Sequence, residues 1–427
     1  MNTSPYYDLT PPIRSWIGVY FWLLLIEGML RKWVLPQYSD MIFVIRDPVV
    51  LVIYALTLRA RVFPFGAAIV TVAVMAGLSL AFSMTKETPP IVVLFGLRTN
   101  YLHLPLVFVM ATVMRRRDVI KIGNWCMLAS VPIVLLMIMQ FNADPSSVLN
   151  ATAGAGEGLQ LRGAMGKIRP PGPFSFITGA VAFFGVTSAF VVDGWLRAGR
   201  YARNTLWAAT AATVIAVPVS ISRSMLLAVL IVLTFGLVAL FRDVRRIPRL
   251  LGPLIAFAAF LSFAADTIYV RAFLTRWDES MKGGAGGFYD NVVERLMTPF
   301  IEPFDIAANA PLFGHGIGIG TVAGARLMTG KYDFLLGESE LVRIILELGP
   351  LLGFAFIAWR LWLAWMLVWQ SWKVVLSKGD VLPWLLAGST FLGVLMGQWG
   401  PATTLGFAVF GAGLILAAAN DPERIAA

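Results

Sequence analysis

The stretch RRRDVIKIGNWCMLASVPIVLLMIMQF, residues 115–141, decides the fold class. Three arginines precede an apolar run of about 20 residues, the length that an α-helix needs to cross the roughly 30 Å hydrocarbon core of a bilayer. The single cysteine of the chain, Cys126, lies inside this run. An intrachain disulfide is therefore impossible, and we interpret Cys126 as a packing residue.

The composition of the whole chain agrees with this stretch. Hydrophobic residues make up 58% of the 427 residues and charged residues only 14%, against about 25% charged in a soluble globular protein. The mean hydropathy is +0.77. These values exclude a water-soluble enzyme, a disordered protein and a secreted disulfide scaffold. They predict an all-α polytopic membrane protein in which residues 1–427 form a single transmembrane domain.

Twelve apolar runs are long enough to be transmembrane helices, and together they would need about 240 residues. We expect them at 15–35, 41–58, 64–82, 90–112, 119–141, 173–193, 204–221, 224–241, 250–266, 341–369, 381–398 and 400–419. We find no internal repeat among them, which disfavours a transporter built from inverted repeats.

The formal net charge of +10 is concentrated between the apolar runs. Basic clusters follow every second predicted span. They comprise Arg59 and Arg61; Arg115, Arg116, Arg117 and Lys121; Arg197, Arg200 and Arg203; Arg242, Arg245, Arg246 and Arg249; and Lys373 and Lys378. This is the positive-inside pattern, so we expect that face and both termini to be cytoplasmic, with some attraction to anionic membrane lipid.

The clusters are short and carry no interleaved aromatic residues, so we expect no nucleic-acid partner. Arg14 precedes a full-length span, so no cleaved signal is predicted.

Two longer loops are expected on the opposite, outer face. Residues 142–172 are rich in Gly, Ala and Pro, and residues 267–340 are the longest non-apolar stretch. The second loop contains a helix-like segment from Val292 to Ala308 and the turn LFGHGIGIG at 312–320. A loop of this length is uncommon unless it has a function. We therefore expect the 267–340 loop to be partly helical and to carry part of a site.

Ionisable residues inside the predicted spans need a partner or a wet cavity, because charge in the bilayer is costly. They include Glu27, Arg31, Lys32, Arg46, Asp47, Arg98 and His103, and a cluster of Glu338, Glu340, Arg343 and Glu347 lies at the start of the span at 341–369. We interpret Glu27–Arg31 and Arg46–Asp47 as ion pairs that stabilise helix packing. For Arg98 and His103, packing and function stay open.

Arg169 and Arg223 differ from these residues, because neither has an acidic neighbour in its own segment. A cation near the bilayer without a local partner favours an anionic ligand, and a phosphate group supplies bidentate contacts.

The predicted span at 341–369 is about 43 Å long, more than the bilayer core needs. We expect its first turns to project into an outward cavity and a kink at Gly349-Pro350.

Four stretches in order resemble the O-antigen ligase and O-antigen polymerase superfamily of membrane glycosyltransferases, which implies a C-type glycosyltransferase-like fold. They are KIRPPGPFSF (167–176), SISRSMLLA (220–228), APLFGHGIGIG (310–320) and GESELVRIILELGPLLG (337–353). The resemblance covers roughly residues 160–355. It implies transfer of a glycan from undecaprenyl pyrophosphate to an acceptor hydroxyl, outside the bacterial inner membrane, without metal, cofactor or nucleotide sugar.

The resemblance also implies roles for particular residues. Arg169 and Arg223 correspond to the arginines that hold the pyrophosphate, and we add Arg343 to them. The family histidine falls nine residues before Glu347, where this chain has Glu338. We predict Glu338 as the general base with Glu340 in reserve, because a carboxylate can serve as base. A helix N-terminal carboxylate is the alternative for Glu338. His315, Arg31, Arg98 and His103 are further candidates.

Three functions stay open at this point. The first is a polymerase that extends a lipid-linked polysaccharide, with a chain-length regulator or flippase as partner. The second is a ligase of the same superfamily, which joins a finished glycan to a lipid or protein. The third is a non-catalytic transporter of lipid-linked sugars that uses the same arginines to bind pyrophosphate.

Overall fold

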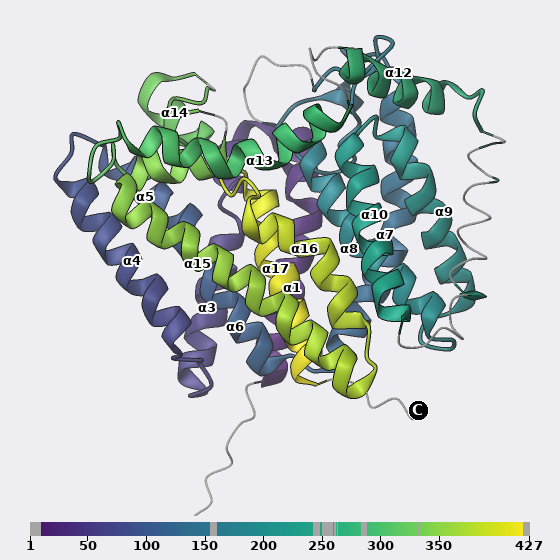
Figure 1. Ribbon diagram of the computed structural model, residues 1–427, viewed down its shortest axis with the longest axis horizontal. Helices are drawn as coiled ribbons and strands as arrows, with labels where there is room; N and C mark the ends of the chain where they lie inside the picture. Colours follow the sequence, from purple (N-terminus) through teal and green to yellow (C-terminus); the bar gives the residue numbers. More distant parts are fainter. Residues whose placement is uncertain are drawn as a thin grey trace, which may run out of the picture.

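The computed structural model is all-helical, and it describes residues 10–153, 160–241, 248–249, 259, 262, 264–282, 288–331, 333–337 and 339–421. Long helices stand side by side in a bundle, and α13 lies across one end of it (Figure 1). Within the described residues no β-strand is present, and a single isolated bridge pairs Arg162 with Ile168. The predicted all-α class is confirmed.

Several helices, alone or joined end to end, are long enough to be membrane spans. The bundle consists of α1 (Thr10–Met29), α2 (Ser39–Ile42), α3 (Arg46–Arg59), α4 (Ala67–Met84), α5 (Pro90–Leu97), α6 (Leu104–Val113), α7 (Arg116–Asn142), α8 (Ile177–Leu196), α9 (Arg203–Val219), α10 (Arg223–Leu240), α15 (Glu340–Lys378), α16 (Leu382–Leu395) and α17 (Ala402–Asn420). Short π-helical segments extend α1 (Leu30–Val34) and join α5 to α6 (Arg98–Leu102). Within the described residues, nine continuous helical stretches are apolar and long enough to cross a membrane. The chain is therefore a multi-pass membrane protein.

Three of the twelve expected spans are not among these nine. The expected span 204–221 is α9, with 17 residues, and 381–398 is α16, with 14 residues. The expected span 250–266 lies almost wholly outside the described residues. The count of twelve stays a prediction.

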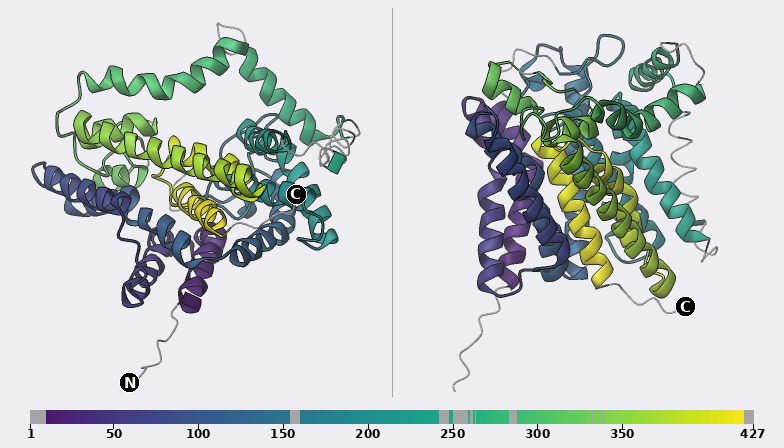
Figure 2. Two further views of the ribbon diagram at one scale, coloured as in Figure 1. Left: turned by 60° about the horizontal axis from the view of Figure 1, so that its bottom comes forward. Right: turned by 60° about the vertical axis from the view of Figure 1, so that its left-hand side comes forward.

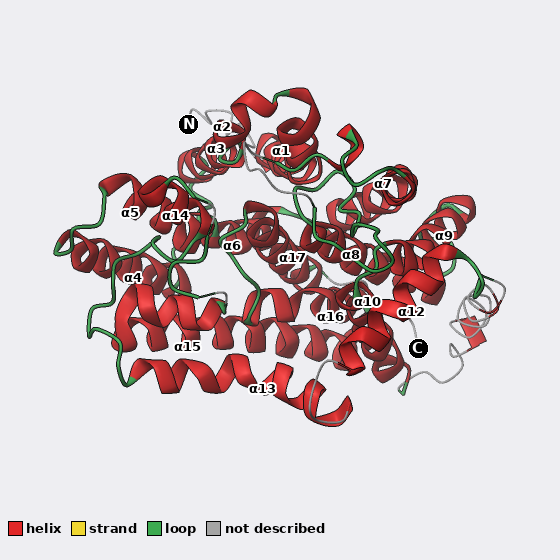
Figure 3. Ribbon diagram, turned by 90° about the horizontal axis from the view of Figure 1, so that it is seen from above, coloured by secondary structure: helices red, strands yellow, loops and turns green. Residues whose placement is uncertain are grey.

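Helix α17 lies in the middle of the bundle, next to α6, α8 and α16 (Figure 3). In the most apolar part of α17, 89% of the residues are buried, and in that of α8 the share is 83%. Both helices are rich in glycine and alanine, whose small side chains let neighbouring helices approach closely, as is usual inside membranes.

The predicted basic face forms one end of the bundle. There the Arg116 backbone N–H donates to the Asp421 carboxylate, and Asp380 pairs with both Arg116 and Arg197. The Arg14 side chain donates to the Val113 carbonyl at the same end. Both ends of the described chain therefore lie opposite α13 and α14 (Figure 2). Which side of the membrane this end faces stays a prediction.

The expected outer loop at 267–340 contains three helices: α12 (Ile268–Lys282), α13 (Phe288–Ala307) and α14 (Val322–Thr329). The predicted helical segment from Val292 to Ala308 is thus confirmed as most of α13. The aromatic rings of Phe304 on α13 and Phe354 on α15 stack 5.0 Å apart, which attaches this loop to the bundle.

Candidate functional site

A tight hairpin positions Arg169. Its turn residues Met165 and Gly166 both have positive φ, +55° and +71°, as a two-residue type I′ turn requires. The Lys167 N–H donates to the Ala164 carbonyl at 3.0 Å, and the Arg169 N–H donates to the Leu161 carbonyl at 2.9 Å. The backbone of Arg169 is therefore held in place by hydrogen bonds to the other arm of the hairpin.

Gly172, three residues later, is clamped by the side chain of Gln140 at the end of α7. Gln140 accepts from the Gly172 N–H at 2.8 Å and donates to its carbonyl at 3.2 Å. The buried Lys32 ammonium donates to the same carbonyl at 2.7 Å. Gln140 was not among the predicted site residues. The sequence did carry a signal for it, because Gln140 is a polar amide side chain close to the end of the apolar span predicted at 119–141.

The turn between α9 and α10 contacts this hairpin. Ile221 in the turn has φ +47°, a strained conformation for a β-branched residue, and its side chain is buried. A Cβ added at Gly163 of the hairpin would come within 2.8 Å of the Ile221 side chain. Arg223 begins α10 two residues further on. Two stretches that are 58 residues apart at Gly163 and Ile221 are thus in contact. Strained backbone of this kind clusters at functional sites.

Arg169, Arg223 and Arg276 of α12 form a group of neighbouring cations. Burial of Arg169, then the positive charges of Arg276 and Arg223, lower the pKa of the Arg169 guanidinium. The Nε atoms of Arg169 and Arg276 are buried, and neither has a hydrogen-bond acceptor among the described residues. The Arg276 Nη1 pairs with Glu279 at 3.2 Å. Arg276 was not predicted, because nothing local distinguishes it from the other charges of an amphipathic loop helix.

Arg343 lies in a second, separate group at the start of α15, where its charge is balanced. It pairs with Glu340 at 2.9 Å and Glu347 at 2.6 Å, and it donates to the Asn100 side chain at 3.0 Å. Glu340 also pairs with the fully buried Arg360 at 3.0 Å. These two arginines and two carboxylates are neutral as a set. Arg343 is therefore satisfied without a ligand, and both Glu340 oxygens already accept from arginine.

The Gly-rich turn packs on this second group. The His315 N–H donates to the Leu346 carbonyl at 2.8 Å, and the Gly320 N–H donates to the Glu347 carboxylate at 2.9 Å. Gly349 breaks α15 with φ +78° and ψ +166°, which confirms the predicted kink. The side chain of His315 is exposed. Glu338, the predicted base, lies outside the described residues.

The remaining predicted residues form a third group around α1, α3 and the Arg98–Leu102 segment. Glu27 pairs with Arg31 at 3.4 Å, as expected. The predicted Arg46–Asp47 pair is wrong. Arg46 pairs with Glu27 at 3.1 Å, and Asp47 pairs with Arg98 at 2.6 Å and His103 at 3.0 Å. Neighbours in sequence point to different sides of a helix, so each finds a partner on another segment.

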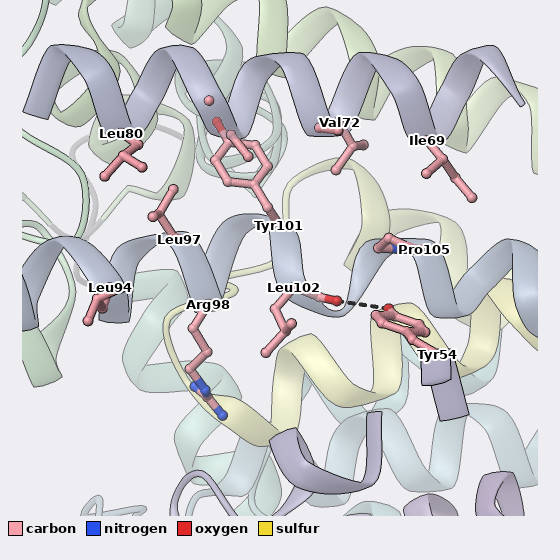
Figure 4. A pocket seen from close by; sticks show the side chains of 13 residues that line it. Tyr54, Ile69, Val72, Leu80, Leu94, Leu97, Arg98, Tyr101, Leu102 and Pro105 are labelled. Carbon is pink, nitrogen blue, oxygen red and sulfur yellow. Dashed lines mark hydrogen bonds between the residues drawn. The ribbon is translucent and has the colours of Figure 1, made fainter. Parts of the chain in front are cut away.

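A groove of about 510 Å³ opens between α4 and the α5–α6 region (Figure 4). Its lining is almost wholly apolar, and the Tyr54 hydroxyl donates to the Leu102 carbonyl at its edge. Arg98 lines it, but the guanidinium binds Asp47 and the Phe43 carbonyl. This surface suits hydrocarbon rather than sugar.

Comparison with known proteins adds no assignment, because no family model and no curated protein matches the chain. In the part of the chain that the structure describes, no three His, Cys, Asp or Glu side chains are grouped so as to hold a metal ion.

Proposed function

We propose that this protein is a polymerase of a surface or exported polysaccharide in a bacterial inner membrane. Its donor is a glycan on undecaprenyl pyrophosphate, and its acceptor is a sugar hydroxyl of a lipid-linked repeat unit. The observation that carries the proposal is the contact between the hairpin of Arg169 and the turn that precedes Arg223, with Arg276 as a further positive neighbour of Arg169. The positive charges of Arg276 and Arg223 act unfavourably on that of Arg169, and a pyrophosphate bound beside Arg169 would compensate this effect through charge-assisted, bidentate hydrogen bonds.

In the proposed reaction the acceptor oxygen attacks the anomeric carbon of the donor glycan. The bond between that carbon and the pyrophosphate oxygen breaks with inversion, and undecaprenyl pyrophosphate leaves with the electron pair. The three arginines stabilise the negative charge that develops on the leaving oxygen. The proton of the acceptor hydroxyl passes to a general base, for which we retain Glu338.

Contrary to what the sequence had led us to expect, in this proposal Glu340 is not the reserve base and Arg343 does not bind pyrophosphate. Both are occupied by internal ion pairs, so we assign them a positioning role at the start of α15, two residues and five residues after Glu338. Under the positive-inside pattern, the arginine group faces the periplasm and both termini face the cytoplasm.

Purified protein in detergent, supplied with lipid-linked repeat units, tests the proposal. We expect wild type to lengthen the glycan and Arg169→Ala, Arg223→Ala and Arg276→Ala each to slow elongation roughly 100-fold or more, as is typical when one electrostatic stabiliser is removed. Arg162→Ala is the matched control, since Arg162 lies exposed on the same hairpin as Arg169. We expect it to elongate normally.

Full-length polymer from both Arg169→Ala and Arg223→Ala at normal protein level would remove the proposal. Wild type that transfers a finished glycan to another acceptor, without adding repeats, would indicate a ligase. Binding of the lipid-linked sugar without any transfer would indicate a transporter.

A further inference from the structure

A second groove, distinct from the arginine group, lies between the first turns of α1 and the start of α7, at the basic end of the bundle. Its volume is about 660 Å³. Both helices lie at the periphery of the bundle, so the groove can be reached from the membrane (Figure 3). The lining includes Arg14, Arg117, Asp118, Lys121, Trp22 and Trp125.

The charges of this groove do not cancel. Arg14 lies 3.4 Å from Asp118, whose carboxylate also accepts from the Arg115 N–H at 2.8 Å. That leaves Arg117 and Lys121, which are both exposed and have no carboxylate within 4 Å among the described residues. They are spaced i, i+4 on α7, so the two like charges face the same side and disfavour the helix in the absence of an anion.

An aromatic wall continues the groove away from these cations. The rings of Trp22 and Trp125 lie 5.4 Å apart, and the Lys121 ammonium lies 5.0 Å from the Trp125 ring. Trp22 is 41% exposed. From Pro11 to Trp22 the groove follows α1 for about 16 Å at 1.5 Å per residue. The groove thus combines exposed cations with an apolar, aromatic wall, as a phospholipid combines a charged head group with acyl chains.

We propose that this groove binds one anionic phospholipid from the bilayer. The phosphate lies between Arg117 and Lys121, and an acyl chain lies along Val19, Trp22 and Trp125. Each cation near an anionic lipid surface contributes about 1 kcal/mol, and tryptophan favours the boundary between head groups and hydrocarbon. This site is independent of the glycan chemistry proposed above.

Native mass spectrometry of the full-length protein, released from nanodiscs of phosphatidylcholine with phosphatidylglycerol or cardiolipin, tests the proposal. We expect wild type to retain one anionic lipid under activation that removes phosphatidylcholine. Arg117→Ala/Lys121→Ala should weaken retention roughly 30-fold, the equivalent of two such cations. Arg59→Ala/Arg61→Ala is the matched control: it removes the same charge from exposed residues at the same end, outside the groove, and should retain the lipid.

Gly18→Leu provides an independent variant that keeps every charge. A Cβ at Gly18 would be 3.8 Å from the Trp125 ring, so it fits, and the longer side chain would fill the groove. We expect reduced lipid retention with unchanged thermal unfolding. Equal retention by wild type and both groove variants would overturn the proposal, as would equal loss in the Arg59/Arg61 control. Displacement of the lipid by inorganic phosphate in excess would indicate a phosphate site and overturn the lipid assignment.

Discussion

Arg169 and Arg343 were both predicted to bind pyrophosphate, but the structure places Arg343 beside carboxylates and Arg169 near other arginines. Arg343 is buried between two carboxylates, and its side chain is only 4% exposed. Arg169 has two arginines as its charged neighbours, and burial and their positive charges lower its pKa. Folding therefore favours the charge of Arg343 and disfavours that of Arg169. A residue whose charge costs stability in the empty protein is a candidate for ligand binding.

Arg169→Ala should leave the free energy of unfolding unchanged or raise it, while it slows elongation roughly 100-fold or more. The sign follows from the lowered pKa, because the folded state without ligand is the state that disfavours the charge. Thermal unfolding of the purified protein in detergent measures the effect.

Arg343→Ala is the comparison for this experiment. It leaves Glu340 and Glu347 with less compensation in the protein interior, and breaking a buried pair in this way costs about 3–5 kcal/mol. If Arg169→Ala destabilised the protein as strongly as Arg343→Ala, the assignment of Arg169 to ligand binding would lose its basis.

At the scale of elements, the break in α15 joins the Gly-rich turn to the bundle. The chain turns at Gly349, whose conformation is accessible essentially only to glycine. A Cβ at this position would meet the Leu312 carbonyl oxygen at 2.1 Å, so the turn can pack here only against a residue without a side chain. This contact positions the first turns of α15, which begins two residues after Glu338 in the sequence.

Gly349→Ala should therefore destabilise the protein by roughly 3 kcal/mol or more, because strain and a backbone clash add together. We also expect elongation to fall, since the turn and the start of α15 can no longer pack together. Protein yield, thermal unfolding and elongation are the measurements.

Gly77→Ala in α4 is the matched control. A Cβ at Gly77 has nothing within 4 Å, and alanine favours a helix over glycine, so its unfolding temperature should stay the same or rise slightly. Wild-type stability of Gly349→Ala would show that the close contact between the turn and α15 is dispensable.

At the scale of the whole molecule, the bundle has two chemically different ends. One carries both ends of the described part of the chain and ion pairs such as Arg116–Asp380 and Arg197–Asp380. The other carries α12, α13 and α14 (Figure 1). Because positive charge is retained on the cytoplasmic side, this asymmetry predicts the orientation of the whole protein.

Single cysteines introduced in a Cys126→Ala background test the orientation. Cys126 is the single cysteine of the sequence, so its replacement leaves the introduced cysteine as the one thiol that can be labelled. In cells with a permeabilised outer membrane, a membrane-impermeant maleimide should label Thr329→Cys, at the end of α14. It should label Ser377→Cys, at the end of α15, only after the inner membrane is opened. Both positions are exposed. The reverse order of labelling would invert the predicted topology.

The class of the protein and its helical stretches could be predicted from the sequence, because the bilayer sets a length and a polarity for consecutive residues. The span at 119–141, the segment that became α13 and the kink at Gly349 all follow from local composition. Likewise, the absence of an acidic neighbour in its own segment was enough to single out Arg169.

Partner choice among the charged residues was decided only by the tertiary structure. Arg46 and Asp47 are adjacent in the chain, yet Arg46 pairs with Glu27 and Asp47 pairs with Arg98, 51 residues away. Arg276 joins Arg169 from a distant helix, and Gln140 clamps a loop that begins beyond its own span. The physical reason is that a buried charge is satisfied by whichever group the packing of helices brings within a few ångströms, and that packing depends on the whole chain at once.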